Sequence, residues 1–527
     1  MGSERRLLPP VPRLTSPPSQ IADGAPGSRT IGARAIRRGV ALNLVGALAP
    51  ALVAVFCIRV VAGGLGPARF GVLSLAWVFI NAVGILDLGI GRALTRFLAV
   101  REEQDARREA SVVWTSLAAI LALSACAGAA AWGFAGAVAE SLAHGDGALR
   151  AETASALRIL ALSVPSVMLS SGLRGVLEAF GRFELTNRVN IPVTLLNLIL
   201  PAVLLQLGAS LLAVVSALVL LRGAATLVLL VFVLDVLPAM RRPQLCARGM
   251  RGVLAYGGWV TVSHVPGPLF AQAERYFLGS LAALSAVAFY ATPAELLSRV
   301  TVIPGAVVQV LFPVIAQALQ GDPPRAARLA NRGLLLIAGA VLPVLTGLAA
   351  VAPEALDAWL GHEFAAQGGR AARIIALATF MDCMAWHAFS VVQSAGLARW
   401  TGRLRAVEIP IYLGIAGVLI HRWGIEGAAL ASLIRATVDG AALAWMASRV
   451  LGTRGRVGRL YALFVGVGAV AIAGASAPVP LALRLAWTAL ALGAAGAAAW
   501  RLLDREVREA VSSRAAAAWA RMGSVSS

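Results

Sequence analysis

Ionisable side chains that interrupt long apolar stretches are the residues of this sequence best placed to do chemistry. Twelve such residues stand out: Arg59, Arg92, Arg222, Arg275, Arg299, Arg435, Asp87, Glu274, Glu295, Asp382, Glu408 and Asp439. A charge at the centre of a bilayer costs on the order of 2.5–3.5 kcal/mol by insertion scales, so such groups usually face a cavity or a partner. Guanidinium groups hold phosphate through paired hydrogen bonds. The arginines therefore predict an anion-binding cavity.

Five of the arginines are our candidates for lining one shared cavity. They are Arg59, Arg92, Arg275, Arg299 and Arg435. Arg59 and Arg275 lie near the ends of their apolar stretches, where a long side chain can also reach the membrane surface. These two arginines occupy matching places in an internal repeat, described below. The match favours a position in the cavity over one at the membrane surface. Two acid–arginine pairs four residues apart, Glu295 with Arg299 and Arg435 with Asp439, also suit plain salt bridges.

Three carboxylates have no obvious partner on their own helix. Asp87, Asp382 and Glu408 are therefore candidates to bind a proton or a sodium ion and to couple transport to an ion gradient. Each could instead neutralise a buried arginine. That alternative is favoured for Asp87, which lies just over one helical turn before Arg92.

Several other kinds of chemistry have no support in the sequence. The chain has no lysine, so it has no P-loop, and its five histidines and four cysteines show no metal-ligand or catalytic spacing. The longest connections on the outer side are about 20 residues, which leaves no room for the acid/base domain that a membrane glycosyltransferase or polymerase usually carries. We expect no enzyme activity and no cofactor.

The elements that position these charges are membrane-spanning helices. Of the 527 residues 59% are hydrophobic and 14% are charged, and the apolar residues fall in blocks of about 20. Blocks of that length cross a bilayer as helices, because a backbone in lipid must satisfy its own hydrogen bonds. We expect an all-α polytopic membrane protein with about fourteen transmembrane helices. The block at 284–318 is long and contains Pro304, which predicts a kink.

The arginines also predict the orientation of the chain. With the N-terminus in the cytoplasm, 33 arginines fall in the tails and on the cytoplasmic side, seven fall on the opposite side, and six lie within spans. This bias follows the positive-inside rule and places both termini in the cytoplasm. It also explains the net charge of +20 without nucleic acid as a partner.

The sequence repeats itself with an offset of 215 residues. Residues 156–188 and 371–403 share nine identities without gaps, including Arg158 with Arg373 and Gly181 with Gly396. A repeat of six spans gives two parallel six-helix lobes around a central cavity, with one appended helix pair. The expected divisions are a disordered basic tail (1–38), an N-lobe (39–240), a C-lobe (249–450), the appended pair (456–501) and an amphipathic tail (502–527). Chance similarity between apolar stretches is the alternative.

Four segments resemble one family of transporters. They are LGPARFGVLSLAWVFINAVGILDLGIGRALTRFLA at 65–99, RGVLEAFGRFELTNRVN at 174–190, AERYFLGSLAALSAVAFYATPAELLSRVTVIPGAVVQVLFPVIAQ at 273–317 and WGIEGAALASLIRATVD at 423–439. In order and spacing they are similar to the O-antigen-flippase-like polysaccharide transporters of the multidrug/oligosaccharidyl-lipid/polysaccharide (MOP) exporter superfamily.

The resemblance implies a function that the residues alone do not give. It implies a flippase that moves polyprenyl-pyrophosphate-linked oligosaccharide across the cell (plasma or inner) membrane for cell-surface polysaccharide synthesis, in contact with membrane lipids. Cavity arginines would meet the pyrophosphate or acidic sugars, and glycosyltransferases or a polymerase of the pathway would be partners. The alternatives are a multidrug/cation antiporter of the related branch and a membrane polymerase or ligase of the same pathway.

Overall fold

The computed structural model describes residues 33–83, 94, 98, 106–143, 146–242, 266–452 and 456–502. The elements are α1 (Ala33–Val83), α3 (Ala106–Leu142), α4 (Gly147–Ala161), α5 (Val164–Ala179), α6 (Phe183–Gln206), α7 (Leu211–Val236), η2 (Pro238–Arg241), α9 (Pro266–Leu281), α10 (Leu284–Ser298), η3 (Arg299–Thr301), α11 (Val302–Gly321), α12 (Pro323–Leu360), α13 (His362–Ser394), α14 (Ala398–Val450), α15 (Arg456–Ala475) and α16 (Leu481–Leu502). Within these ranges the fold is all-α, as the apolar blocks predict.

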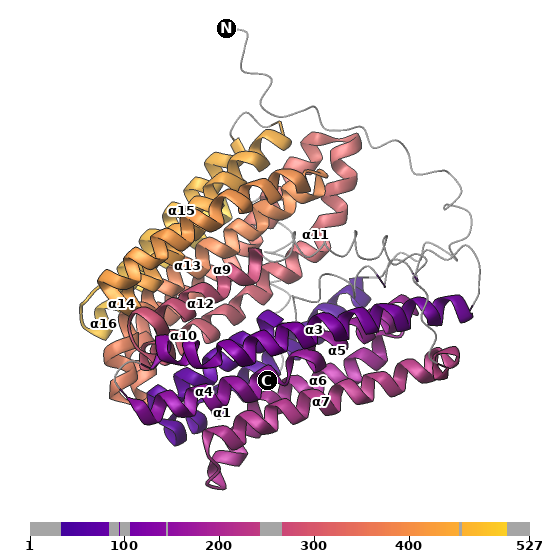
Figure 1. Cartoon of the computed structure of the whole chain (residues 1–527). Coiled ribbons are helices and arrows are strands. Elements are labelled where there is room, and N and C mark those ends of the chain that lie inside the picture. The colour runs from indigo at the N-terminus through magenta and orange to yellow at the C-terminus, as the bar shows by residue number, and fades with distance from the viewer. Residues whose placement is uncertain are drawn as a thin grey trace, which may run out of the picture.

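The helices form two bundles that follow the order of the chain (Figure 1). Helices α1 and α3–α7 make the first bundle, and α9–α14 make the second, with α15 and α16 packed beside it. Here we call them the N-bundle and the C-bundle. The expected domain boundaries stay a prediction, and most of both expected tails lies outside the described residues.

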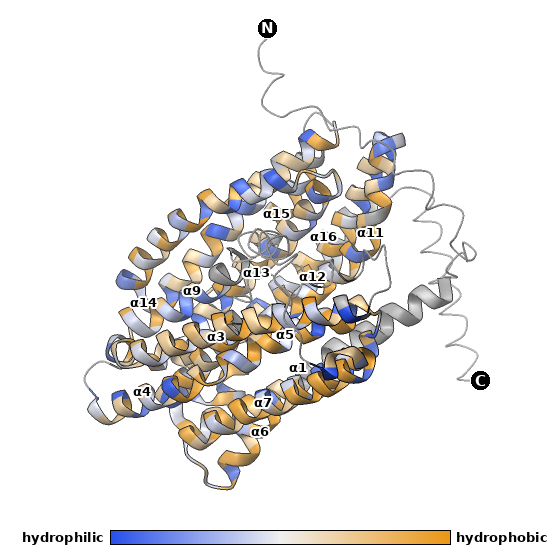
Figure 2. Ribbon diagram, turned by 45° about the vertical axis from the view of Figure 1, so that its right-hand side comes forward, coloured by the Kyte–Doolittle hydropathy of each residue, from blue (hydrophilic) through white to orange (hydrophobic). Residues whose placement is uncertain are grey.

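Large apolar side chains lie on the outside of the bundles, as expected for helices that contact lipid. Helix α7 exposes Leu220, Leu227 and Val231, and Figure 2 shows hydrophobic residues along most of α6 and α7. Nine helices in the described part of the chain are long and apolar enough to cross a membrane, and parts of α15 and α16 are shorter apolar helices. The protein is therefore a multi-pass membrane protein, while the expected number of fourteen spans stays a prediction.

Two of the long helices contain a sharp break at a glycine. Helix α14 has 53 residues, about 80 Å if straight, which is more than twice the bilayer core. It turns back at Gly424, where φ is +53°, and a Cβ at Gly427 would lie only 2.0 Å from the carbonyl oxygen of Leu419. Helix α1 breaks in the same way at Gly66, where φ is +72°. Gly66 falls between apolar blocks at 40–62 and 70–97, and Gly424 falls between blocks at 408–421 and 425–448.

The bundles touch each other near the start of α10 and near the end of α12. A Cβ at Gly71 of α1 would lie 1.9 Å from the carbonyl oxygen of Leu284 at the start of α10, so the two backbones are in direct contact. The indole N–H of Trp359 at the end of α12 donates to the carbonyl of Val55, at 2.7 Å. Away from these ends, α11 and the N-bundle diverge (Figure 1).

Candidate functional site

A cavity of about 480 Å³ lies where α1, α5, α6 and α7 of the N-bundle face α9, α10 and η3 of the C-bundle. Four arginines, two asparagines and one glutamate supply the charged and amide groups of its described lining: Arg174, Arg222, Arg275, Arg299, Asn190, Asn197 and Glu295. Ser170, Thr194 and Trp77 also line it. With four cations and one acid, this lining carries a formal charge of +3 and favours an anionic ligand.

On the C-bundle side of the cavity, one carboxylate bridges two arginines. Glu295 accepts hydrogen bonds from Arg299 at 2.6 Å and from Arg275 at 3.4 Å. The first contact confirms the salt bridge that the four-residue spacing predicts. The helix tightens into η3 at Arg299 because Pro304, four residues after Val300, has no N–H to donate to the Val300 carbonyl. A short 3₁₀ turn thus lies at the cavity wall, close to Pro304, where the sequence predicts a kink.

The N-bundle side carries two arginines that were not among the predicted cavity residues. Arg174 of α5 donates to the side-chain oxygen of Asn190 on α6, at 3.3 Å. Arg222 lies in the middle of α7. Its Nε is buried and has no hydrogen-bond partner among the described residues. The two guanidinium groups are close enough for their positive charges to repel each other.

Three of the five predicted arginines lie elsewhere or outside the described residues. Arg59 is exposed, does not line the cavity and donates to the carbonyl oxygen of Ala358 at 3.4 Å. Its position on α1 is turned toward α12 rather than toward the cavity, so a matching place in the repeat does not fix the direction of a side chain. Arg435 belongs to the C-bundle cluster described next. Arg92 and the carboxylate candidate Asp87 lie outside the described residues.

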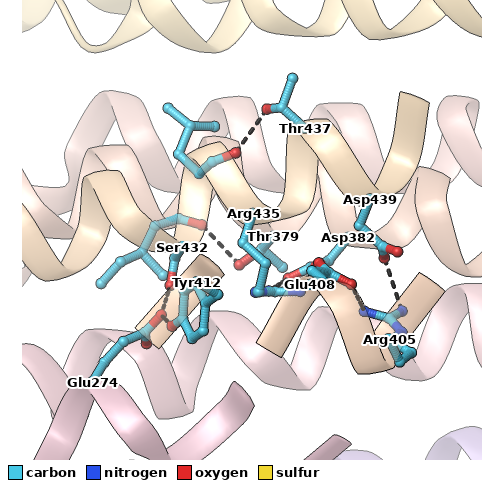
Figure 3. Close-up of polar contacts among 12 residues, drawn as sticks. Glu274, Thr379, Asp382, Arg405, Glu408, Tyr412, Ser432, Arg435, Thr437 and Asp439 are labelled. Atoms are coloured by element: carbon cyan, nitrogen blue, oxygen red, sulfur yellow. Dashed lines mark hydrogen bonds and ion pairs between the residues drawn. The ribbon is translucent and has the colours of Figure 1, made fainter. Parts of the chain in front are cut away.

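A cluster of four acids and two arginines lies inside the C-bundle (Figure 3). Arg435 pairs with Asp382 of α13 at 2.8 Å, and its guanidinium lies 5.9 Å from the centre of the Tyr412 ring. Arg405 pairs with both Glu408, at 3.1 Å, and Asp439, at 2.8 Å. The remaining acid is Glu274 of α9.

These contacts correct two sequence expectations. Asp439 and Arg435, four residues apart on α14, take other partners at 2.8 Å, because Arg405 and Asp382 approach them from other helical segments. Glu408 does have a partner on its own segment, Arg405 three residues earlier. The sequence missed that pairing because Arg405 precedes the apolar stretch.

Glu274 is enclosed by hydroxyl groups. It is 5% exposed, and Tyr290, Tyr412 and Ser432 each donate a hydrogen bond to its carboxylate. Tyr290 and Ser432 also bond to each other at 3.1 Å. The donors come from α10 and from both halves of α14, so the sequence order gives no sign of this arrangement.

The cluster has more negative than positive groups. With all six side chains ionised its formal charge is −2, and a bilayer interior penalises such an excess. Glu408 Oε1 and Asp439 Oδ1 are buried and accept no hydrogen bond within the described residues. Both acids are bonded to Arg405, so these two oxygens belong to neighbouring carboxylates. A proton or a small monovalent cation would compensate the charge there.

Known proteins with the same fold are membrane transporters. An inward-facing multidrug resistance MATE family transporter of the MOP superfamily superposes with a TM-score of 0.66, at 14% identity, over 78% of this chain and 99% of that one. The lipid II flippase MurJ, in an inward closed conformation, gives 0.65 at 9% identity over 87% and 99%. At these identities the likeness establishes the fold.

Comparison of the sequence with known proteins also identifies a family. A Shigella flexneri protein, provisionally named an O-antigen transporter, is 26% identical over 409 residues, which are 77% of this chain and 96% of that protein. The sequence model of the polysaccharide biosynthesis protein family matches residues 60–367, more than half of the chain. The segments at 65–99, 174–190 and 273–317, which carry the resemblance, lie within that match. The chain therefore belongs to the polysaccharide biosynthesis protein family, on a fold shared with MOP-superfamily transporters.

Proposed function

We propose that the protein is a flippase that moves a polyprenyl-pyrophosphate-linked oligosaccharide across the cytoplasmic membrane by alternating access. The observation that carries the proposal is the cavity between the bundles, whose described lining has four arginines and one glutamate. Guanidinium groups suit the oxygens of a pyrophosphate. The asparagines and Ser170 suit the hydroxyl groups of sugars.

The contacts between the bundles support a state that opens toward the cytoplasm. Gly71 with Leu284 and Val55 with Trp359 join the bundles near connections that the arginine bias assigns to the outer side. With the outer ends closed, a lipid-linked sugar made in the cytoplasm enters from the inner leaflet. The outer contacts then part and the inner ends close, and the lipid-linked sugar is exposed to the other side of the membrane.

The C-bundle cluster is where an ion gradient would act. The two buried oxygens of Glu408 and Asp439 take up a proton or sodium ion, and the salt bridges to Arg405 adjust as the charge changes. In this scheme Glu408 is a coupling residue, as the sequence predicts, while Asp382 holds Arg435 in place.

A multidrug/cation antiporter on the same fold is disfavoured by the polarity of the cavity. An organic cation entering the described lining would face a formal charge of +3, which repels it. An enzyme of the pathway is disfavoured because the described lining holds one carboxylate, Glu295, and two arginines already bond to it.

The proposal is tested by deletion and by reconstitution. Cells that lack the protein should accumulate the lipid-linked oligosaccharide on the cytoplasmic face, because synthesis continues while translocation stops. Proteoliposomes with the purified protein should expose a labelled lipid-linked oligosaccharide to an external glycosidase faster than liposomes without it. An unchanged lipid pool together with no gain in exposure rejects the flippase.

A further inference from the structure

Helices α1 and α12 exchange hydrogen bonds where the two bundles meet. The indole N–H of Trp359 donates to the carbonyl of Val55 at 2.7 Å. One turn later on α1, Arg59 donates to the carbonyl of Ala358 at 3.4 Å. Ala358 is among the last residues of α12, whose carbonyls the helix itself leaves unpaired. These two bonds are called the outer latch here, because the arginine bias assigns the end of α12 to the outer side.

The latch shares a wall with the cavity. A space of about 10 Å³ lies beside Trp359, and its lining includes Ile58 of α1 and the C-bundle charges Glu295 and Arg299. A space that small holds at most about one water molecule. Ile58, Glu295 and Arg299 also line the cavity of about 480 Å³. These three side chains therefore have little room to move without changing what lies next to Trp359.

The two shared charges hold each other. Arg299 begins η3 and donates to Glu295 at 2.6 Å. A pyrophosphate in the cavity competes with Glu295 for this guanidinium group, since both are oxyanions that accept charge-assisted hydrogen bonds. When the guanidinium group turns toward the cavity, it leaves the wall of the space beside Trp359. The contact that the ligand loosens is thus part of the surroundings of the latch.

We propose that the outer latch is released by cargo. An anionic headgroup in the cavity draws Arg299 from Glu295, the wall beside Trp359 opens, and the outer ends part. The inference rests on the proposed function, because it names the step by which cargo opens the outer side. Trp359 is a positioning residue in this scheme, since it acts on the bundles through α1 and does not line the described cavity.

Distances across the outer ends of the purified full-length protein test the latch. Spin labels replace the exposed Arg150 of the N-bundle and Glu363 of the C-bundle, in a background without the four native cysteines. Geranyl pyrophosphate, a short soluble pyrophosphate, is the ligand, and calorimetry measures its binding. The ligand should raise the ratio of long to short distances about fivefold, the equilibrium effect of one hydrogen bond.

Trp359→Phe keeps an aromatic ring and removes the N–H that forms the latch. Without ligand it should raise the same ratio about fivefold, and the ligand should then add less than about twofold. By reciprocity, geranyl pyrophosphate should bind this variant up to about fivefold more tightly, which also shows that the variant is folded.

Two further variants grade the effect of the latch. Arg59→Gln should change the ratio of distances by about twofold or less, because its bond is long and exposed. Trp445→Phe is the matched control for Trp359→Phe. Trp445 is an exposed tryptophan of the C-bundle that contacts Arg449, and its replacement should leave the distances and their response to ligand unchanged.

Glu295→Gln separates sensing from binding. The variant keeps the size of the side chain and holds Arg299 less strongly, because the charge of the acceptor is lost. It should still bind geranyl pyrophosphate, and its distances should be the same with and without the ligand. A merely structural role of Glu295 would leave the response to ligand in place.

Each contrary outcome overturns a definite part of the scheme. Binding of geranyl pyrophosphate without a change in distance rejects release by cargo and leaves the flippase standing. Unchanged distances in Trp359→Phe reject the latch, and a ligand response that survives in Glu295→Gln rejects the path through Arg299. A protein whose latch responds to the ligand but which does not speed exposure of the lipid-linked oligosaccharide in proteoliposomes rejects the flippase and leaves the latch standing.

Discussion

At the scale of single residues, Glu295 is the one acid in the described lining of the cavity and it restrains two arginines. Glu295→Gln removes a negative charge and keeps a side chain of the same size. We expect geranyl pyrophosphate to bind about threefold to tenfold more tightly to this variant, because the cavity becomes more positive. Calorimetry on the purified protein measures the change.

The comparison variant is Arg299→Gln, which removes one of the two cations held by Glu295. It should weaken geranyl pyrophosphate about tenfold. If both variants shift the affinity in the same direction, charge is not what the cavity uses to hold the pyrophosphate.

Glu408 is expected to control ion coupling without affecting the substrate cavity. Glu408→Gln removes one of the two buried carboxylate oxygens that lack a partner in the described structure. A cation gradient should then no longer accelerate translocation, and the rate should fall to the value seen without a gradient. Glu426→Gln is a suitable control, since Glu426 forms an exposed pair with Arg370. Proteoliposomes with and without proton or sodium gradients provide the measurement, and a gradient response that survives Glu408→Gln would count against the cluster.

The sequence predicted the kind of residues in the cavity better than their identities. Arg275 and Arg299 line it as expected, because each interrupts an apolar stretch. Arg222 was visible as a charge within a span, and the repeat nearly pairs it with Arg435, but it was not among the five arginines predicted to line the cavity. Arg174 sits close to a span end and looked like part of a connection, although α5 continues past it to Ala179. Side-chain direction decides these cases, and single-sequence periodicity does not give it.

At the scale of helices, the internal repeat is visible in the turns. Gly181 follows α5 and Gly396 follows α13, 215 residues apart, and both have positive φ, +69° and +76°. The repeat therefore extends to matching helix ends. The two copies differ where Pro165 corresponds to Phe380: the first is broken at 162–163 into α4 and α5, whereas α13 is continuous. The matching turns follow from aligning the two copies, whereas the break before Pro165 was not predicted, because the apolar stretch there suggests one continuous span.

Gly396→Ala tests the conformational requirement at this turn. The positive φ should make the substitution destabilising by about 1–2 kcal/mol. Gly402→Ala is the matched control, because Gly402 is helical and a Cβ there meets nothing within 4 Å. That change should be neutral or stabilising by up to about 1 kcal/mol. Thermal unfolding midpoints in detergent compare the two, and equal midpoints would contradict the strain assigned to Gly396.

At the scale of the whole molecule, the contact between Gly71 and Leu284 should hold the outer ends together. A Cβ at Gly71 would lie 1.9 Å from a backbone oxygen, which no side-chain rearrangement relieves. Gly71→Ala should therefore force the bundles apart on the outer side. Spin labels replacing the exposed Arg150 and Glu363, in a background without the four native cysteines, should report a longer distance.

Gly63→Ala is the control for this experiment, since it lies on the same helix and its Cβ meets nothing within 4 Å. It should leave the distance between the labels unchanged. An unchanged distance in Gly71→Ala would mean that the outer contact adapts locally and does not hold the bundles together.

Helix α9 has one further consequence for the whole molecule. Glu274 and Arg275 are consecutive residues, so their side chains leave the helix about 100° apart. The first bonds to Tyr290 in the C-bundle interior, and the second to Glu295 at the cavity, both on α10. One pair of helices is thus joined by side-chain contacts on two faces, and we expect a change at one contact to alter the other. Thermodynamic reciprocity makes the two effects equal. In the ion-coupled flippase proposed above, the leak of ions without cargo, or of cargo without ions, would then depend on how stiffly these two helices hold together.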